Sequence, residues 1–227
     1  MQKKEITVCA CSSRRIMNGA EIITLVSALK NAGQSVAVVP DLCKTAVADA
    51  GQMAAFASTI VVACYPRAVR SIFDALRLKP KQIFDIRNHI SEQILNEMGI
   101  ANPVFSPEQS LPEFESKEGQ EAWYPVIDKE RCTECGKCHD FCLFGVYSVV
   151  QGVVKVAQPQ NCKNNCPACA RVCSSRAIIF PKYEKSPING GLHDEEKFDE
   201  TETKELYNIA LKHKLAERRA KVSLLKN

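Results

Sequence analysis

Long hydrophobic runs are missing from this chain of 227 residues. Even its longest apolar stretches, such as residues 60–64, fall far short of the roughly 20 residues that a membrane span requires. The beginning of the chain also lacks the apolar segment of a signal peptide. We therefore expect a cytoplasmic protein with no membrane span.

Basic residues are not gathered anywhere except in the final stretch of the chain. The 30 basic and 26 acidic residues leave a formal net charge of +4, which is spread along the sequence. A nucleic-acid-binding protein usually gathers basic side chains on one face or along one helix. We therefore expect no nucleic-acid partner.

Cysteine, by contrast, is abundant, with 12 residues. In a reducing compartment this number is better explained by metal or redox chemistry than by disulfides. The length allows two modest domains and an arm. Composition predicts an α/β domain at residues 1–100, a linker at 101–122, a cysteine-dense domain at 123–183, and an extended segment with an amphipathic C-terminal helix at 184–227.

Strand-like and helix-like patterns alternate through residues 1–100. Short runs rich in valine and isoleucine predict strands at residues 5–10, 35–40, 58–66 and 81–87. Apolar positions three or four residues apart predict helices at residues 19–33, 44–57 and 67–78. Because strands that alternate with helices form parallel sheets, we expect an α/β fold with a parallel sheet.

Two similar cysteine motifs follow each other within residues 123–183. The stretch "RCTECGKCHDFCLFG" has the spacing C-x2-C-x2-C-x3-C, and "NCKNNCPACARVCSS" has the spacing C-x3-C-x2-C-x3-C. Three thiolates on a tight loop can each bind a different iron of a [4Fe-4S] cluster, and the fourth cysteine lies one helical turn later. The motif cysteines are Cys132, Cys135, Cys138 and Cys142, and then Cys162, Cys166, Cys169 and Cys173.

With these motifs, residues 123–181 closely resemble the bacterial-type two-cluster ferredoxin domain, an α+β fold. A hairpin pattern that turns near Gln151 and Gly152, and a closing strand at residues 177–181, agree with this resemblance. It implies that the fourth cysteine of each motif binds the cluster of the other motif. The first thiol set is then Cys132, Cys135, Cys138 and Cys173, and the second thiol set is Cys142, Cys162, Cys166 and Cys169.

Two positions depart from that family's pattern, and another metal is an alternative. Leu143 and Ser174 stand where a proline commonly follows the fourth cysteine, and the second motif has one extra residue. Zinc at two four-thiolate sites is the alternative, although zinc ribbons usually join two separated C-x2-C pairs. We expect His139, inside the first motif, to cover or tune the cluster rather than to bind it.

Four further cysteines follow predicted strand ends within the first hundred residues. Because the carboxyl ends of parallel strands share one edge of a sheet, we expect these thiols to converge there and to hold a third [4Fe-4S] cluster. The alternatives are a redox-active dithiol at Cys9 and Cys11, a zinc site, or inert buried thiols. This N-terminal thiol set is Cys9, Cys11, Cys43 and Cys64.

The neighbours of these cysteines resemble the N-terminal cluster-binding domain of the heterodisulfide reductase flavoprotein subunit family. The similar stretches, within residues 5–98, are "VCACSSRR", "DLCKTAVADAGQ", "IVVACYPRAVRSIFDAL" and "QIFDIRNHISEQI". Gly51, Gln52 and Arg67 match that family's Gly-Gln pair and arginine. The family's dinucleotide-binding G-x-G-x-x-G loop is missing from the sequence, so we expect no flavin on this chain and a flavin-containing partner.

Basic residues accompany the N-terminal thiol set. Arg87 follows the fourth predicted strand and is the best candidate to line the site. Three interpretations stay open for the others: they raise the potential of a cluster, steer an acidic partner, or form a solvated face. These residues are Arg14, Arg15, Arg67 and Arg70.

Together these patterns predict an iron-sulfur electron-transfer protein or subunit rather than a catalyst. We expect it to relay single electrons through three [4Fe-4S] clusters to or from a flavin-containing oxidoreductase. The alternative is a catalytic or thiol-redox role of the N-terminal thiol set, supplied with electrons by the ferredoxin domain. A basic amphipathic helix, predicted from about residue 202 to residue 225, either packs on the chain or docks on the partner.

Overall fold

The computed structural model describes residues 3–13, 16–87, 89–100, 122–191, 208 and 211–212. The chain divides into two compact units, Met1–Ala122 and Trp123–Asn227, and each is described by itself. The predicted linker, apart from residue 122, lies outside the described residues, as do Arg14 and Arg15. The predicted C-terminal helix also lies outside them, except for helical residues at positions 208, 211 and 212.

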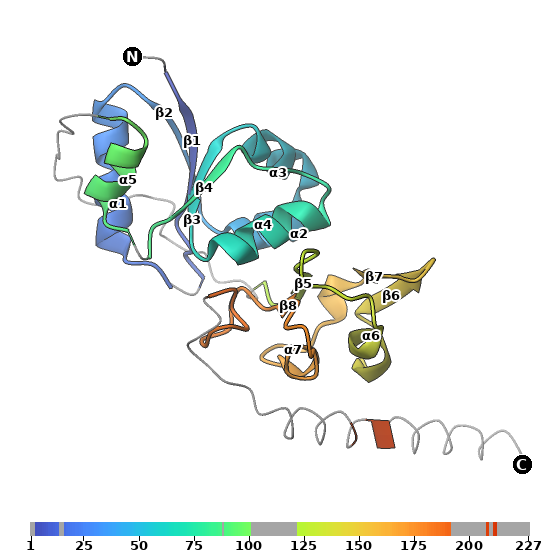
Figure 1. Cartoon of the computed structure of the whole chain (residues 1–227). Coiled ribbons are helices and arrows are strands. Elements are labelled where there is room, and N and C mark those ends of the chain that lie inside the picture. Colours follow the sequence, from blue (N-terminus) through green and yellow to red (C-terminus); the bar gives the residue numbers. More distant parts are fainter. Residues whose placement is uncertain are drawn as a thin grey trace, which may run out of the picture. The chain divides into compact units, whose positions relative to one another are not determined.

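The first unit is built on a parallel sheet (Figure 1). The strands lie in the order β2-β1-β3-β4, and every neighbouring pair is parallel. The predicted α/β fold with a parallel sheet is therefore confirmed. The strands are β1 (Glu5–Cys9), β2 (Ser35–Val39), β3 (Ile60–Ala63) and β4 (Gln82–Asp85).

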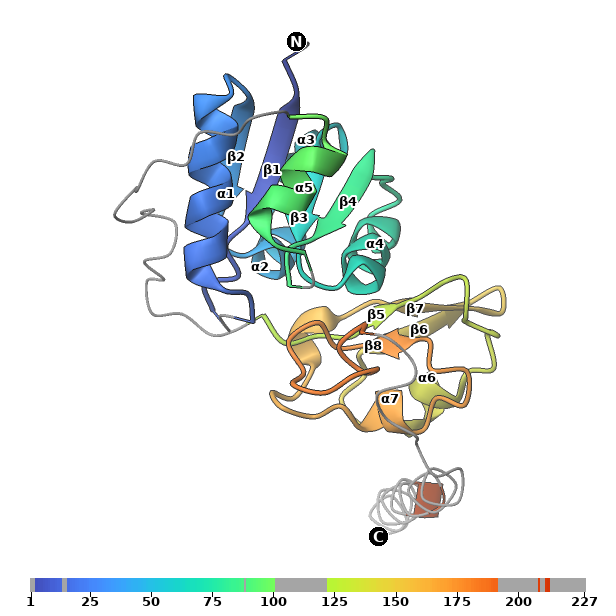
Figure 2. The same ribbon diagram turned by 60° about the vertical axis from the view of Figure 1, so that its left-hand side comes forward.

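Helices cover both faces of this sheet (Figures 1 and 2). One face carries α1 (Gly19–Asn31) and α5 (Ser91–Glu97). The other face carries α2 (Leu42–Ala48), α3 (Ala50–Ala57) and α4 (Pro66–Ala75). The sequence predicted no helix at α5, which has only 7 residues and thus too little length to show a helical period.

The two central strands, β1 and β3, are buried on both sides, as expected for a sheet covered on both faces. Ile6, Val8 and Val62 are almost completely buried. Thr7, between the first two, is buried as well, and its hydroxyl pairs with the Thr59 hydroxyl at 2.8 Å. This pairing satisfies a polar group that would otherwise destabilise the core.

Local capping explains where the helices of the first unit begin and end. Asn18 begins α1 by accepting the Ala20 N–H at 3.0 Å, and Gly33, with φ of 73°, follows its end. The helix predicted at residues 44–57 is instead two helices, because Asp49 adopts an extended φ of −147°. Its carboxylate accepts the Gln52 N–H at 2.9 Å and so begins α3.

The second unit combines short antiparallel strand pairs with short helices. Strand β5 (Val126–Ile127) pairs with β8 (Ile178–Ile179), and β6 (Tyr147–Val150) pairs with β7 (Val153–Val156). The helices are α6 (Lys137–Phe141), the 3-10 helix η2 (Pro159–Asn161) and α7 (Ala168–Arg171).

The hairpin of β6 and β7 lies where the sequence predicts it. Gln151 and Gly152 form its turn with φ of 51° and 77°. Positive φ at both central residues is typical of the two-residue turns that match the twist of a hairpin. Glycine adopts this geometry without the strain that a side chain brings.

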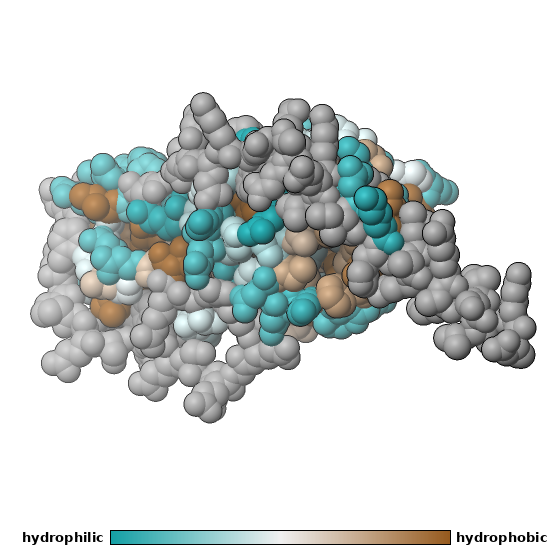
Figure 3. Space-filling view, turned by 90° about the horizontal axis from the view of Figure 1, so that it is seen from below, coloured by the Kyte–Doolittle hydropathy of each residue, from teal (hydrophilic) through white to brown (hydrophobic). Residues whose placement is uncertain are grey.

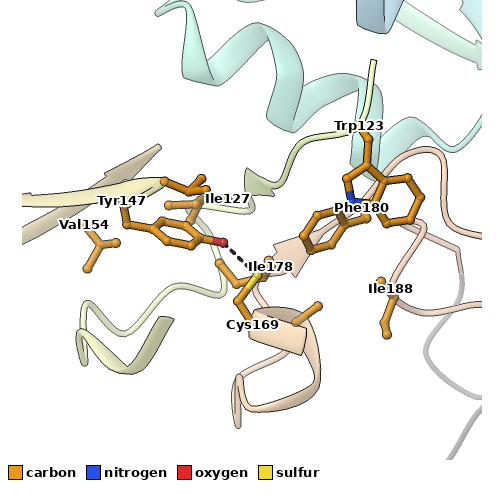
Figure 4. Close-up of a cluster of buried hydrophobic side chains, with 10 residues drawn as sticks. Trp123, Ile127, Tyr147, Val154, Cys169, Ile178, Phe180 and Ile188 are labelled. Atoms are coloured by element: carbon orange, nitrogen blue, oxygen red, sulfur yellow. Dashed lines mark hydrogen bonds between the residues drawn. The ribbon is translucent and has the colours of Figure 1, made fainter. Parts of the chain in front are cut away.

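Aromatic and aliphatic side chains form the core of the second unit (Figure 4). Trp123 stacks on Phe180 with ring centroids 5.3 Å apart, and Tyr183 meets Trp123 edge-on at 6.4 Å. Most of the motif cysteines pack against or within this core, so their sulfur atoms border apolar side chains. They are Cys132, Cys138, Cys142, Cys162, Cys169 and Cys173.

Hydrophobic side chains also reach the surface of the second unit. Val149, Val150 and Val153 are exposed on the hairpin, and Leu143 and Phe144 are exposed after the first cysteine motif. On the face of the molecule drawn in Figure 3, small hydrophobic groups alternate with hydrophilic residues. Within the described part of the chain, no helix is long and apolar enough to cross a membrane.

Replacement of Asp49 by alanine removes the carboxylate that caps α3. We expect the free energy of unfolding to fall by about 1 kcal/mol, the usual cost of losing such a cap. The control Asp49→Asn is expected to keep most of the stability, because asparagine caps helices about as well as aspartate. Urea unfolding followed by far-UV circular dichroism measures both variants, and equal losses in the two would contradict the capping role.

Candidate iron-sulfur sites

The first cysteine motif is a loop that leads into α6. Positive φ at Glu134 and Gly136, of 53° and 74°, curls the chain between Cys132 and Cys138. The helix α6 then ends at Cys142, whose N–H bonds to the Cys138 carbonyl. The first three thiols therefore lie on a tight loop, and the fourth lies one turn later.

The second motif repeats part of this backbone despite its extra residue. Asn165, immediately before Cys166, has φ of 60° and takes the place that Glu134 has in the first motif. Cys169 lies in α7, and Cys173 follows this helix. A further left-handed residue lies three positions after the fourth cysteine of each motif, Gly145 in the first and Arg176 in the second. The two loops therefore share these positive-φ positions, but Pro167, with φ of −94°, stands where the first motif has the left-handed Gly136.

Thiols from both motifs meet in the first thiol set. Burial raises the pKa of Cys138 to about 12, and the nearby thiol of Cys173 adds to this rise, followed by those of Cys132 and Cys135. Burial also raises the pKa of Cys132, again with a contribution from Cys173. The fourth cysteine of the second motif therefore lies among the first three of the first motif.

The second thiol set shows the reciprocal arrangement. Burial raises the pKa of Cys162 to about 12, and the thiols of Cys166 and Cys142 add to it. Burial likewise raises the pKa of Cys169 well above its ordinary value, and Cys142, Cys162 and Cys166 contribute in the same direction. The fourth cysteine of the first motif thus lies among the first three of the second motif.

This arrangement suits a positively charged centre. A buried thiol keeps its proton at neutral pH unless a cation compensates the thiolate, and metal binding supplies that compensation. Eight thiols in two groups of four are the donor set that two four-iron clusters require. The residues present therefore fit such clusters.

Sulfur ligands lie closer together around a single metal ion than around a four-iron cluster. Among the residues that the structure describes, no three His, Cys, Asp or Glu side chains are close enough together to hold one metal ion. Four thiolates around one zinc ion lie about 3.8 Å from each other, because each Zn–S bond is about 2.3 Å long. On a four-iron cluster each thiolate binds a different iron, so the sulfur atoms lie farther apart.

An apolar cavity of about 210 Å³ lies beside the second thiol set, and all four thiols of that set line it. Phe141, Leu143, Phe144 and Tyr147 contribute apolar walls. Apolar surroundings exclude water from the sulfur atoms and strengthen the remaining hydrogen bonds to them.

Hydrogen-bond donors reach sulfur atoms of both sets. The Ala177 N–H donates to Cys173 Sγ at 3.3 Å. The Tyr147 hydroxyl donates to Cys169 Sγ at 3.1 Å. Such bonds stabilise negative charge on sulfur and are one way in which a protein sets the potential of a cluster.

The N-terminal thiol set lies at the carboxyl edge of the parallel sheet. Cys9 ends β1, Cys64 directly follows β3, and Cys43 lies in the first turn of α2, which comes after β2. Cys11 has φ of 49° in the turn beyond β1. All four are buried, and the Leu42 N–H donates to Cys9 Sγ at 3.4 Å. These cysteines thus follow neighbouring strands at one edge of the sheet, and their convergence on one cluster stays a prediction.

Three further side chains, those of Tyr65, Asp85 and Arg87, interact at the same edge of the sheet. Arg87 Nη2 bonds to the Asp85 carboxylate at 2.7 Å, and its guanidinium carbon lies 3.5 Å from the centre of the Tyr65 ring. Burial raises the pKa of Tyr65, which follows Cys64, while Arg87 lowers it. Sequence reasoning found Arg87 but missed Tyr65 and Asp85, although both stand at or just after strand ends.

Other residues named from the sequence lie on helices α3, α4 and α6. Arg67 is partly buried and Arg70 is exposed on α4. Gly51 and Gln52 lie in the first turn of α3. His139 pairs with the exposed carboxylate of Asp140 at 3.1 Å, and its expected covering role stays a prediction.

Glu134 ties the first cysteine loop to the hairpin. Its carboxylate accepts the Val154 N–H at 2.5 Å and pairs with Lys129 Nζ at 3.4 Å. Lys129 Nζ also donates to the Val154 carbonyl at 2.9 Å. These bonds lower the pKa of Glu134, the Val154 N–H being the main cause.

Comparison with known proteins adds one relative. No family model matches the chain. An uncharacterized ferredoxin of Methanocaldococcus jannaschii is 44% identical over 81 residues, which is 35% of this chain and 54% of that protein. The chain thus spans about half the length of the curated relative that it matches. The resemblance of residues 5–98 to the heterodisulfide reductase family stays a prediction.

Substitution Glu134→Ala removes the acceptor that holds the Val154 N–H. We expect the free energy of unfolding to fall by about 1.5 kcal/mol, as for a hydrogen bond to a charged group. Glu134→Gln is expected to lose less, because its amide oxygen still accepts this bond. Urea unfolding followed by the fluorescence of Trp123, the single tryptophan, reports on this unit.

Glu130→Ala is the matched control, because Glu130 is an exposed acidic side chain near the same loop. Its stability is expected to stay within about 0.5 kcal/mol of the wild type. A similar loss in Glu130→Ala and Glu134→Ala would show that the hydrogen bond to Val154 is not what stabilises the loop.

Proposed function

We propose that this chain is an iron-sulfur electron-transfer protein, or the electron-transfer subunit of an oxidoreductase. The observation that carries the proposal is the grouping of eight thiols into two sets, each combining three cysteines of one motif with the fourth of the other. Similarity to a protein named as a ferredoxin supports it. A bound [4Fe-4S] cluster accepts and releases one electron at a time.

The chain's residues have three tasks in this proposal. The thiolates of the first and second sets bind iron in place of their protons. Donors such as the Ala177 N–H stabilise negative charge on the ligating sulfur atoms. The apolar side chains around the cavity keep water away from the second set.

The N-terminal thiol set is proposed to hold a third cluster. Four buried thiols at one sheet edge support this assignment, as does the Leu42 N–H that donates to Cys9 Sγ. The guanidinium of Arg87 supplies positive charge near this edge, although its pair with Asp85 offsets part of that charge. Positive charge near the thiolates favours the more reduced, more negative state.

The partner in this proposal is a flavin-containing oxidoreductase. Single-electron carriers of this kind exchange electrons with a redox enzyme, and the chain has no dinucleotide-binding glycine loop of its own. The exposed hydrophobic residues after the first motif, Leu143 and Phe144, also line the cavity of the second thiol set. They offer a short route between this set and a docked protein.

Iron and acid-labile sulfide, measured per chain on anaerobically purified protein, test the number of clusters. We expect about twelve irons in the wild type, at four irons per cluster. Serine at all four positions of the N-terminal thiol set is expected to lower this to about eight. Serine at all four positions of the first thiol set is the matched control and is expected to cause an equal loss.

Two other results would contradict this account. About eight irons in both the wild type and the N-terminal variant would mean that the N-terminal thiol set holds no cluster. Zinc in place of iron in the wild type would contradict electron transfer as a whole, because zinc has no redox chemistry.

A further inference from the structure

One buried hydroxyl in the second unit has a sulfur atom as its partner. Tyr147, at the start of β6, is 5% exposed, and its hydroxyl donates to Cys169 Sγ at 3.1 Å. Figure 4 shows the ring pointing from the hairpin towards the sulfur on α7. The bond therefore joins two elements that lie 22 positions apart in the sequence.

The surroundings of this hydroxyl are apolar. Tyr147 belongs to the core that includes Ile127, Val154 and Ile178. A phenylalanine ring would fill the same space without burying a polar group, which costs free energy unless the group is hydrogen-bonded. A tyrosine is tolerated here because the sulfur of Cys169 accepts its hydrogen bond.

The position of Tyr147 lies between the two thiol sets. Besides Cys169, its hydroxyl interacts electrostatically with Cys138 of the first set and Cys142 of the second. Of these three thiols, Cys169 is the one that receives its hydrogen bond. The direct effect of the hydroxyl is therefore expected on one set and not on both.

We propose that Tyr147 tunes the potential of the second thiol set's cluster by donating a hydrogen bond to Cys169. This inference rests on the proposed function, since it requires an iron-bound thiolate at Cys169. Reduction adds one electron and so increases the negative charge that the ligating sulfur atoms share. A donor stabilises the more negative state more strongly, so the Tyr147 hydroxyl raises the reduction potential.

Reduction of the cluster transfers one electron and no proton. One electron comes from the reductant, which is dithionite in the experiment below, and the proton stays on Tyr147 Oη in both oxidation states. No bond to Tyr147 forms or breaks.

In the first set, the Ala177 N–H donates to Cys173 Sγ at 3.3 Å, and any non-proline residue would supply this backbone donor. The Ser175 hydroxyl also lies 3.5 Å from Cys173 Sγ in the first set, but Ser175 is only partly buried. Tyr147 differs in being almost completely buried.

A redox titration with dithionite, followed by electron paramagnetic resonance, tests this on the full chain with its clusters. Tyr147→Phe is expected to lower one midpoint potential and leave the others unchanged. Loss of one hydrogen bond corresponds to a change of up to about tenfold in the reduction equilibrium. A tenfold change equals 59 mV for a one-electron couple.

Tyr183→Phe is the matched control. Tyr183 packs against the same core, but its hydroxyl accepts a hydrogen bond from Arg171 Nη2 at 3.1 Å. This variant is expected to keep every midpoint potential. Replacement of Tyr147 by 3-fluorotyrosine keeps the shape of the core and strengthens the donor, so the same midpoint is expected to rise.

Two outcomes would overturn the inference, and they are distinguishable. Unchanged midpoints in both Tyr147 variants, with full iron content, would reject the tuning role and leave the proposed function intact. A wild-type chain that binds no iron would reject both. A downward shift in Tyr147→Phe, an upward shift with 3-fluorotyrosine and no shift in Tyr183→Phe would support the inference.

Discussion

Burial of thiol groups is the constraint on which the rest of this structure depends. Thiolate charge is unfavourable in apolar surroundings unless a cation or hydrogen-bond donors compensate it. The two loops of the second unit bring eight thiols into two sets, and the parallel sheet of the first unit brings four more to one edge. The folding of the second unit and iron binding are therefore expected to be coupled.

The fold of the first unit was largely readable from its hydrophobic pattern. Strands β1 to β4 and helices α1 and α4 appear where valine-rich runs and three- to four-residue spacing predict them. Periodicity did not reveal the break at Asp49, because a capping aspartate changes the backbone without changing the apolar spacing. It also missed α5 and the two-residue strand β5, which are too short to carry a period.

The sequence predicted which thiols make up each candidate site, but not which residues surround them. Spacing and resemblance named all twelve cysteines, and the structure brings the fourth cysteine of each motif to the other motif. The partners of these thiols depend on the packing of elements distant in sequence. The bonds of Tyr147 to Cys169 and of Glu134 to Val154 therefore carry no local signal, nor does the stacking of Arg87 on Tyr65.

The central claim is that two four-iron clusters each take thiolates from both motifs. An anomalous difference map at the iron absorption edge, from crystals grown anaerobically, tests it most directly. The account predicts two separate groups of four iron peaks, one with Cys173 beside the first motif and the other with Cys142 beside the second. Single metal peaks at each motif, or a group of irons bound by all four cysteines of one motif, would contradict it.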